Sequence, residues 1–108
     1  KDRIFQSFIF SLSQNFRTHH SVSFYAAEQC LTPRYFSTIV REKSGRNALQ
    51  WIMMFIIAEA KKLLSDPDPS IKEIAETLGF SNQSFFGRYF KQYVGLSPMA
   101  FRSSGAEE

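Results

Sequence analysis

The sequence predicts a small all-α fold of about seven helices, and three observations lead to this prediction. Apolar residues recur at the three- and four-residue spacing of amphipathic helices. Nearly every such run begins at a capping residue and ends at a glycine or a proline. No segment alternates polar and apolar residues as a half-buried strand does. The chain has 108 residues, of which 44% are hydrophobic, and this is enough to bury a core.

Three helices are predicted in the first part of the chain. The first covers about residues 2–17, where apolar side chains follow one helical stripe. Ser23 is the predicted N-cap of a short second helix that ends at Cys30, and we expect Cys30 to pack inside. A Thr-Pro pair at residues 32–33 begins a third helix that ends at Ser44.

A long helix follows and extends to about Leu64. Asn47 with Gln50 three residues later has the pattern of a capping box at its start. The Asp-Pro-Asp-Pro segment at residues 66–69 ends it. This helix is apolar almost all round, so either it is buried on most sides or it docks another domain or a second copy. We favour burial, because two subdomains must pack on it.

Three shorter helices complete the prediction, at about residues 70–78, 81–94 and 97–102. Ser70 and Glu73 form a second capping-box pattern. Ser81 is the predicted N-cap of the next helix, and Pro98 lies at the first position of the last one.

The second half of the chain repeats the first half. Five residues match at an offset of fifty: Phe36, Ile39, Val40, Arg41 and Gly45 match Phe86, Tyr89, Phe90, Lys91 and Gly95. Three earlier residues match at an offset of forty-nine: Ala26, Leu31 and Thr32 match Ala75, Phe80 and Ser81. One extra residue in the second copy explains the difference. Each copy is a short helix, a turn of three or four residues and a longer helix, which is the form of a helix-turn-helix unit.

The longer helix of each copy has a polar face suited to DNA. The apolar residues predicted to face inward are Phe36, Ile39, Val40, Phe85, Phe86, Tyr89, Phe90 and Tyr93. The candidate base readers on the opposite faces are Arg34, Ser37, Thr38, Gln83, Ser84, Gly87 and Arg88. Arg can chelate guanine, Gln can bridge adenine, and Ser or Thr can contact either base. A solvated helix face is the alternative for any one of them, and the repetition of the face favours DNA.

Five further residues are candidates for phosphate contacts. They are a cation farther along each of the two helices, an Arg just after the first of these helices, and two serines near helix N-termini: Arg41, Lys91, Arg46, Ser23 and Ser70.

Gly87 needs its own explanation, because glycine inside a helix costs about 1 kcal/mol relative to alanine. Either DNA approaches the backbone closely there, or a neighbouring helix packs tightly against it.

Charge and composition permit a polyanionic partner without establishing one. The net charge is +3, and the pI is about 9.2. Without Glu107 and Glu108 the net charge is +5, and a C-terminal tail can hold these two residues away from a binding face. The single cysteine favours a reducing compartment, and no signal peptide or membrane span is recognisable, so we expect a cytoplasmic protein with no membrane segment. The start at Lys1, without Met, suggests a piece of a longer protein.

Two other classes of function are compatible with parts of the sequence. Cys30 with His19 or His20 suggests a thiol nucleophile or a metal site, but a fourth ligand and a closed spacing are missing. We therefore expect no metal, no cofactor and no enzyme. A protein-interaction module that docks through the apolar long helix stays open, because the net charge is modest.

Several segments from about residue 21 onward carry a resemblance to a known family. They include SIKEIA and LGF, and they are residues 25–26, 30–37, 59–64, 70–75, 78–80, 84–86, 88, 90–91, 95, 97–98 and 101–102. In these segments the sequence resembles the AraC/XylS family of bacterial transcription regulators. The resemblance implies two homeodomain-like helix-turn-helix subdomains, residues 1–46 and 66–108, bridged by a linker helix at residues 47–65. It also implies sequence-specific binding to promoter or operator DNA, RNA polymerase as a partner, and a missing N-terminal sensor or dimerisation domain.

The chain departs from the family pattern at five positions. Gln29 stands where a buried Leu is usual, so the first short helix should pack less well. Thr38 replaces a long polar residue and should read DNA more weakly. In the linker helix, polar residues are replaced by Met53, Met54 and Ile56.

The linker helix has the length that bipartite DNA reading needs. A helix of about 18 residues spans roughly 27 Å at about 1.5 Å per residue. That is the scale on which two recognition helices can lie about 34 Å apart, one turn of B-DNA. The sequence therefore predicts that one chain reads two successive major grooves in an asymmetric site.

Overall fold

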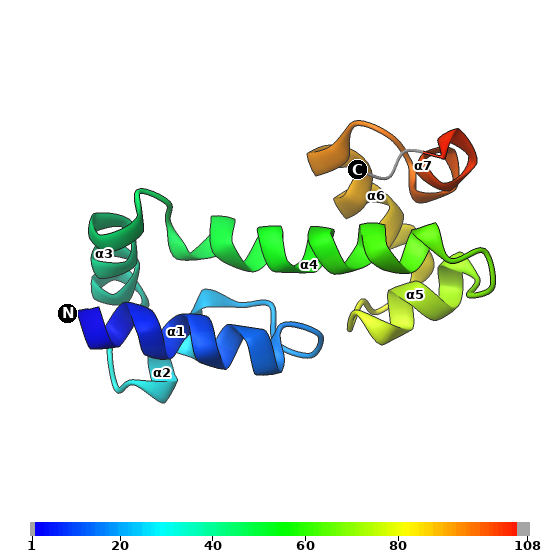
Figure 1. Cartoon of the computed structure of the whole chain (residues 1–108). Helices are drawn as coiled ribbons and strands as arrows, with labels where there is room; N and C mark the ends of the chain where they lie inside the picture. The colour runs from blue at the N-terminus through cyan, green and yellow to red at the C-terminus, as the bar shows by residue number, and fades with distance from the viewer. Residues whose placement is uncertain (1, 106–108) are drawn as a thin grey trace. The chain divides into compact units, whose positions relative to one another are not determined.

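The computed structural model describes residues 2–105, and these residues form seven helices and no strand. In chain order (Figure 1) they are α1 (Asp2–Asn15), α2 (Val22–Glu28), α3 (Pro33–Ser44), α4 (Ala48–Ser65), α5 (Ile71–Thr77), α6 (Gln83–Val94) and α7 (Pro98–Ser104). The predicted all-α fold of seven helices is confirmed over this part of the chain. Lys1, Glu107 and Glu108, on which two of our expectations rest, lie outside the described residues.

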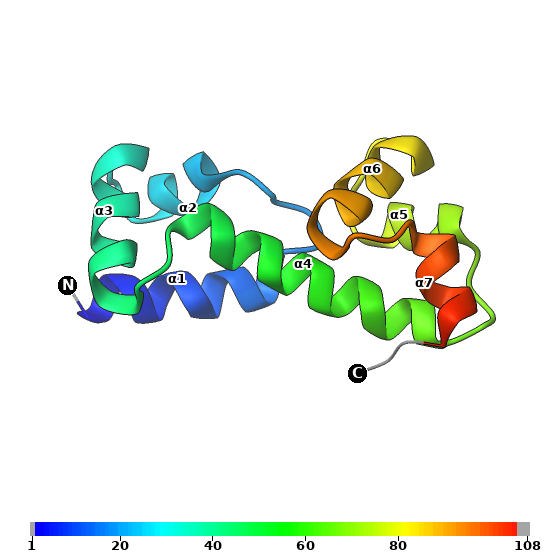
Figure 2. The ribbon, with the colours of Figure 1, turned by 90° about the horizontal axis from the view of Figure 1, so that it is seen from above.

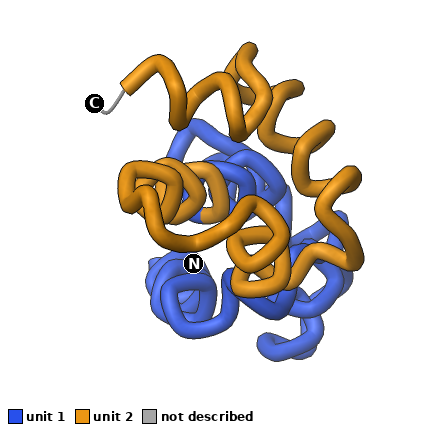
Figure 3. The backbone as a smooth tube through the Cα atoms, turned by 90° about the vertical axis from the view of Figure 1, so that its right-hand side faces the viewer, with its two compact units in different colours: residues 1–55 blue, residues 56–108 orange. Residues whose placement is uncertain are grey.

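The chain divides into two compact units, residues 1–55 and residues 56–108 (Figure 3). Helix α4 is continuous (Figure 2), and its first half belongs to unit 1 and its second half to unit 2. Each unit contains one helix-turn-helix pair, α2–α3 in unit 1 and α5–α6 in unit 2.

Unit 1 is built on α1, which contacts both α2 and α3. The ring of Phe8 makes edge-to-face contacts with Tyr25 and Phe36, at centroid distances of 5.5 and 5.1 Å. At the start of α1, Oδ1 of Asp2 lies 2.6 Å from Nζ of Lys43, and this hydrogen bond and the Lys43 charge lower the pKa of Asp2. The other buried residues of unit 1 are Leu12, Ala26, Ile39, Val40, Ala48 and Ile52.

Unit 2 buries a larger apolar set, drawn from the second half of α4 and from the helices after it. Its buried residues are Ile56, Ile57, Ala60, Leu64, Ile71, Ile74, Ala75, Leu78, Phe80, Phe86, Phe90, Pro98 and Phe101. Arg102 fixes α7 at the end of α4, because its Nε donates to the Leu64 carbonyl at 3.1 Å and its Nη2 to the Asp66 carbonyl at 2.9 Å. These bonds satisfy carbonyls that have no partner within α4.

Most helices begin where their capping residues predict. The Ser70 hydroxyl accepts the Glu73 N–H at 3.0 Å, and the Glu73 carboxylate accepts the Ser70 N–H at 2.8 Å. Asn47 and Gln50 make the same reciprocal pair, with both bonds at 2.9 Å. The predicted N-caps of α3 and α7 also accept one backbone N–H each.

Two predicted N-caps are wrong. Helix α2 begins after Ser21, whose hydroxyl accepts an N–H of the first turn at 3.3 Å, and Ser23 lies inside that turn. Helix α6 begins after Asn82 and not after Ser81, since the Asn82 side chain accepts the N–H of Phe85 at 2.8 Å. At both places two capping residues stand within two positions, and the path of the preceding turn selects between them. The other helix ends lie within two residues of the prediction.

Helix α4 is apolar almost all round, as the sequence predicts, and most of it is covered. Ile52 and Ile56 are buried, and Met53 and Met54 are half-buried. Two apolar residues of α4 are exposed, Leu49 in the first turn, at 54%, and Ala58. Its other apolar side chains are buried or half-buried, in keeping with the burial that we favoured over docking.

Candidate nucleic-acid interface

Matching backbone hydrogen bonds build the two helix-turn-helix turns. The Leu31 N–H donates to the Ala26 carbonyl at 3.0 Å, and the Phe80 N–H donates to the Ala75 carbonyl at 3.0 Å. These donors and acceptors stand forty-nine positions apart, as they do in the sequence repeat. The repeat is therefore confirmed, and each copy has the form of a helix-turn-helix unit.

The two turns differ by one residue. The connection between the paired helices covers residues 29–32 in unit 1 and residues 78–82 in unit 2. The extra residue lies just before α6, and for that reason Asn82, fifty positions after Thr32, is the N-cap. The expected turn of three or four residues is correct for unit 1 and one residue too short for unit 2.

Cys30 lies in the first turn with a φ of 59°, in the left-handed region. Its counterpart in unit 2 is Gly79, with a φ of 82°. A side chain in this conformation costs roughly 1–2 kcal/mol, which glycine avoids. Cys30 is exposed, so our expectation that it packs inside is wrong. The reason is that α2 already ends at Glu28, and its buried face ends with it.

Helix α3 presents the predicted polar face. Its inward residues Phe36, Ile39 and Val40 are buried, as expected. Arg34 and Thr38 are exposed and Ser37 is half-buried. The Thr38 hydroxyl donates to the Arg34 carbonyl at 3.0 Å, so its one proton is used inside the helix and only its oxygen and methyl group face outward.

Helix α6 presents a matching face on unit 2. Gln83, Ser84 and Arg88 are exposed, while Phe86 and Phe90 on the opposite side are fully buried. Among the described residues, neither the Arg88 guanidinium nor that of Arg34 on α3 has a hydrogen-bond or ion-pair partner. Both are available to an acceptor from outside the chain.

Two aromatic residues of α6 that we predicted to face inward are exposed. Phe85 and Tyr93 are 45% and 44% exposed. They flank the half-buried Tyr89 along one edge of the helix, with the Tyr89 and Tyr93 rings 5.1 Å apart. Burial, with a smaller effect of Tyr93, raises the pKa of Tyr89 to about 12. The apolar stripe of α6 is wider than the surface that its neighbours cover, and its edge is left at the surface.

Gly87 lies on α6 where nothing in the described chain requires a glycine. A Cβ atom placed there meets no atom within 4 Å. Of the two explanations that the sequence leaves open, tight packing against a neighbouring helix is therefore wrong. The glycine borders a shallow hollow lined by Ile71, Gln83, Ser84, Gly87, Ser97, Pro98 and Met99.

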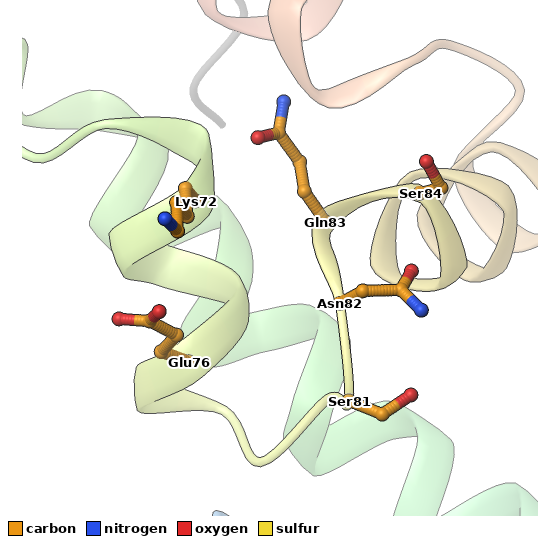
Figure 4. A pocket seen from close by; sticks show the side chains of 6 residues that line it. All are labelled: Lys72, Glu76, Ser81, Asn82, Gln83 and Ser84. Atoms are coloured by element: carbon orange, nitrogen blue, oxygen red, sulfur yellow. The ribbon is translucent and has the colours of Figure 1, made fainter.

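A second hollow lies between α5 and the N-terminus of α6 (Figure 4). Its lining residues are Lys72, Glu76, Ser81, Asn82, Gln83 and Ser84. Sequence reasoning missed Lys72 and Glu76, although their four-residue spacing places them on one face of the supporting helix. They add a cation and a carboxylate beside two of the candidate base readers.

The candidate phosphate contacts are all on the surface. Arg41 and Lys91 are exposed in the last turns of α3 and α6. Arg46 is exposed beside Trp51, with its guanidinium carbon 5.7 Å from the ring centroid. Ser70 caps α5, and Ser23 is exposed in the first turn of α2.

Gln29, the polar replacement at the C-cap of α2, has a hydrogen-bond partner. Gln29 is half-buried, and its Nε2 donates to the Ile4 carbonyl of α1 at 3.1 Å. This bond offsets part of the packing that the usual leucine supplies.

Residues 2–105 contain no group of three or more His, Cys, Asp and Glu side chains placed to hold a metal ion. His19, half of one candidate metal pair, stacks on Phe24 at a centroid distance of 3.7 Å. Over the same residues, no helix is long and apolar enough to cross a membrane.

Comparison with known proteins gives one family. A family model described as a helix-turn-helix domain matches residues 25–104. The arabinose operon regulatory protein of Escherichia coli (strain K12) is 37% identical over 83 residues, which cover 77% of this chain and 28% of that protein. The protein of the same name in Salmonella typhimurium is 34% identical over 86 residues, which cover 80% of this chain and 31% of that protein. The chain thus matches less than a third of the length of these two relatives.

Solved structures resemble the chain over nearly its whole length. The DNA-binding domain of AdpA, a global transcriptional factor, in complex with a target DNA, has a TM-score of 0.79 and 26% identity and covers 94% of this chain and 90% of that one. The C-terminal domain of AraT, a response regulator from Geobacillus stearothermophilus, has a TM-score of 0.86 and 24% identity and covers 94% and 84% of the two chains. The second likeness concerns the fold alone.

Proposed function

Because the chain belongs to the AraC-type helix-turn-helix family of DNA-binding transcription regulators, we propose that it binds double-stranded DNA sequence-specifically, with α3 and α6 in two successive major grooves. One observation carries the proposal. Each of these two matched helices buries most of its apolar face in its own unit and leaves polar side chains on the opposite face, among them an arginine, Arg34 or Arg88, whose guanidinium has no partner among the described residues.

In this proposal the outer faces of both α3 and α6 contact base edges. The readers are Arg34, Ser37, Thr38, Gln83, Ser84 and Arg88, and at Gly87 the absence of a side chain admits DNA close to the helix backbone. Phosphate contacts from Arg41, Arg46, Lys91 and the helix starts near Ser23 and Ser70 fix the two helices in their grooves.

The proposed site is asymmetric and spans about one turn of DNA. The 18 residues of α4 have the length that two boxes about one helical turn apart require. In this proposal the two helix-turn-helix subdomains are residues 1–46 and 66–108, joined by a linker helix at residues 47–65. The parent protein carries a further N-terminal sensor or dimerisation domain, acts in the bacterial cytoplasm, and recruits or blocks RNA polymerase at promoters without being an enzyme.

Selection from random duplex DNA at near-physiological salt tests the proposal. We expect enrichment of two boxes about one helical turn apart, with affinity that falls steeply as salt rises. A single enriched box would limit base reading to one unit. No enrichment, together with binding that ignores salt, would refute DNA reading and favour a protein-docking module.

A further inference from the structure

We infer that the two units read guanine from different turns of their recognition helices: Arg34 from the first turn of α3, and Arg88 from the second turn of α6. This inference rests on the proposed function and makes it more specific. Its consequence is that the guanine of the second box is displaced by about two base pairs from the position it has in the first box.

The structure makes α3 and α6 equivalent residue by residue. Both helices have 12 residues and begin after an N-cap, Thr32 or Asn82. Both end at a left-handed glycine, and the N–H groups of Gly45 and Gly95 donate to the carbonyls four residues earlier, each at 2.8 Å. Caps and ends therefore share an offset of fifty, and residues at that offset occupy the same place on the two helices.

At two pairs of equivalent positions, one helix carries arginine and the other carries a small hydroxyl residue, and the helix that carries the arginine differs between the two pairs. Arg34 on α3 corresponds to Ser84 on α6, and Thr38 on α3 corresponds to Arg88 on α6. Each helix therefore offers one guanidinium that can chelate the O6 and N7 atoms of guanine, and the two guanidinium groups start one helical turn apart. The remaining position on α3 does not compensate, since the Thr38 hydroxyl proton is bonded to the Arg34 carbonyl.

The displacement follows from the two helical repeats. Four residues of an α-helix advance about 6 Å along its axis. Base pairs of B-DNA follow one another at about 3.4 Å. A recognition helix docked in the same way in both grooves thus presents its arginine about two base pairs farther along in the second box.

A second difference between the two boxes also follows from unlike residues at equivalent positions of α3 and α6. The position before Ser84 is Gln83, whose exposed amide can bridge adenine, and its equivalent on α3 is Pro33, which has no polar side chain. The second box should therefore hold an adenine read from the first turn and a guanine read from the second. Of these two bases, the first box should hold only the guanine, read from the first turn.

An exchange of registers tests this inference. The chain with Ser84→Arg and Arg88→Thr carries the α3 pattern on α6, and all the exchanged positions are exposed. Selection from random duplexes with this variant should move the guanine of the second box by about two base pairs, toward the base pairs that face the first turn of α6. The first box should be unchanged. The reciprocal pair, Arg34→Ser with Thr38→Arg, should move only the guanine of the first box, in the opposite sense along its helix.

The possible outcomes separate the two levels of the proposal. A two-box motif in the original chain whose guanines stay in place in both exchange variants refutes the register inference and leaves DNA reading intact. Loss of a guanine preference with no new position also refutes it. Absence of any motif with the original chain refutes the proposed function itself. Melting curves by circular dichroism check that each variant folds, and the two variants change different units.

Discussion

Replacing Gly87 with alanine should stabilise the fold and weaken DNA binding, and this opposition tests the candidate interface directly. The added methyl group enters open space, since a Cβ atom there meets nothing within 4 Å. Alanine in a helix interior is favoured over glycine by about 1 kcal/mol. For a domain of this size, that gain raises the melting temperature by about 4 °C.

The expected loss of DNA affinity has a different cause. If the DNA lies against the backbone of α6 at Gly87, a methyl group at that point separates the two surfaces and weakens the neighbouring contacts of Ser84 and Arg88. We expect at least a tenfold loss of affinity, which corresponds to about 1.4 kcal/mol. Fluorescence anisotropy with the selected duplex gives the affinity, and thermal unfolding followed by circular dichroism gives the stability.

A matched control is available on α4. Ala58 is exposed inside that helix and is not a candidate DNA contact. Its replacement by glycine should lower the stability by about 1 kcal/mol and leave the DNA affinity unchanged, which separates the effect of helix propensity from the effect of the methyl group at Gly87. If Gly87→Ala raises the melting temperature and leaves DNA affinity unchanged, then no DNA approaches the helix at this point and the docking of α6 is wrong as proposed.

Three further predictions use the same two assays. Arg88→Ala should cost about 1–3 kcal/mol of binding and relax one base position, whereas Lys91→Ala should weaken binding to all sequences and lower the salt slope by about one; an equal loss on all sequences for Arg88→Ala would make it a phosphate contact. Cys30→Gly should stabilise the fold by about 0.5–1 kcal/mol by relieving the left-handed conformation, and a fall in melting temperature would contradict this. Asn82→Ala should cost about 1 kcal/mol of stability and Ser81→Ala much less, because only the first caps α6, and equal losses would contradict the assignment.

Capping residues made much of the fold predictable, because their interactions are local. A reciprocal pair such as Ser70 and Glu73 lies within four residues of sequence, so its geometry does not depend on the rest of the chain. The same is true of the glycines that end α3 and α6 in the left-handed conformation. Helix number, order and approximate length follow from these local signals.

The predictions are wrong where tertiary packing, and not local sequence, determines the structure. The helical pattern of α6 marks Phe85 and Tyr93 as apolar, but the width of the covered surface decides whether they are buried, and that width is set by helices far away in sequence. Likewise, periodicity cannot exclude a close neighbour at Gly87, whereas the coordinates of the surrounding helices do. Lys72 and Glu76 belong to the candidate site because α5 lies beside the start of α6, and this tertiary contact is not evident from the sequence.

The one-residue difference between the turns links the fold to the proposed reading of DNA. If Ser81 capped α6 in place of Asn82, the residues of α6 would match those of α3 at an offset of forty-nine throughout. Arg34 would then correspond to Gln83, and Thr38 to Gly87. With the extra residue absorbed before Asn82, both helices start and end at equivalent caps, and the arginines fall on different turns of otherwise matching helices. The position of the extra residue before Asn82 thus decides which side chains of the two helices are equivalent, and the caps Thr32 and Asn82 extend the fifty-residue offset to the starts of both helices.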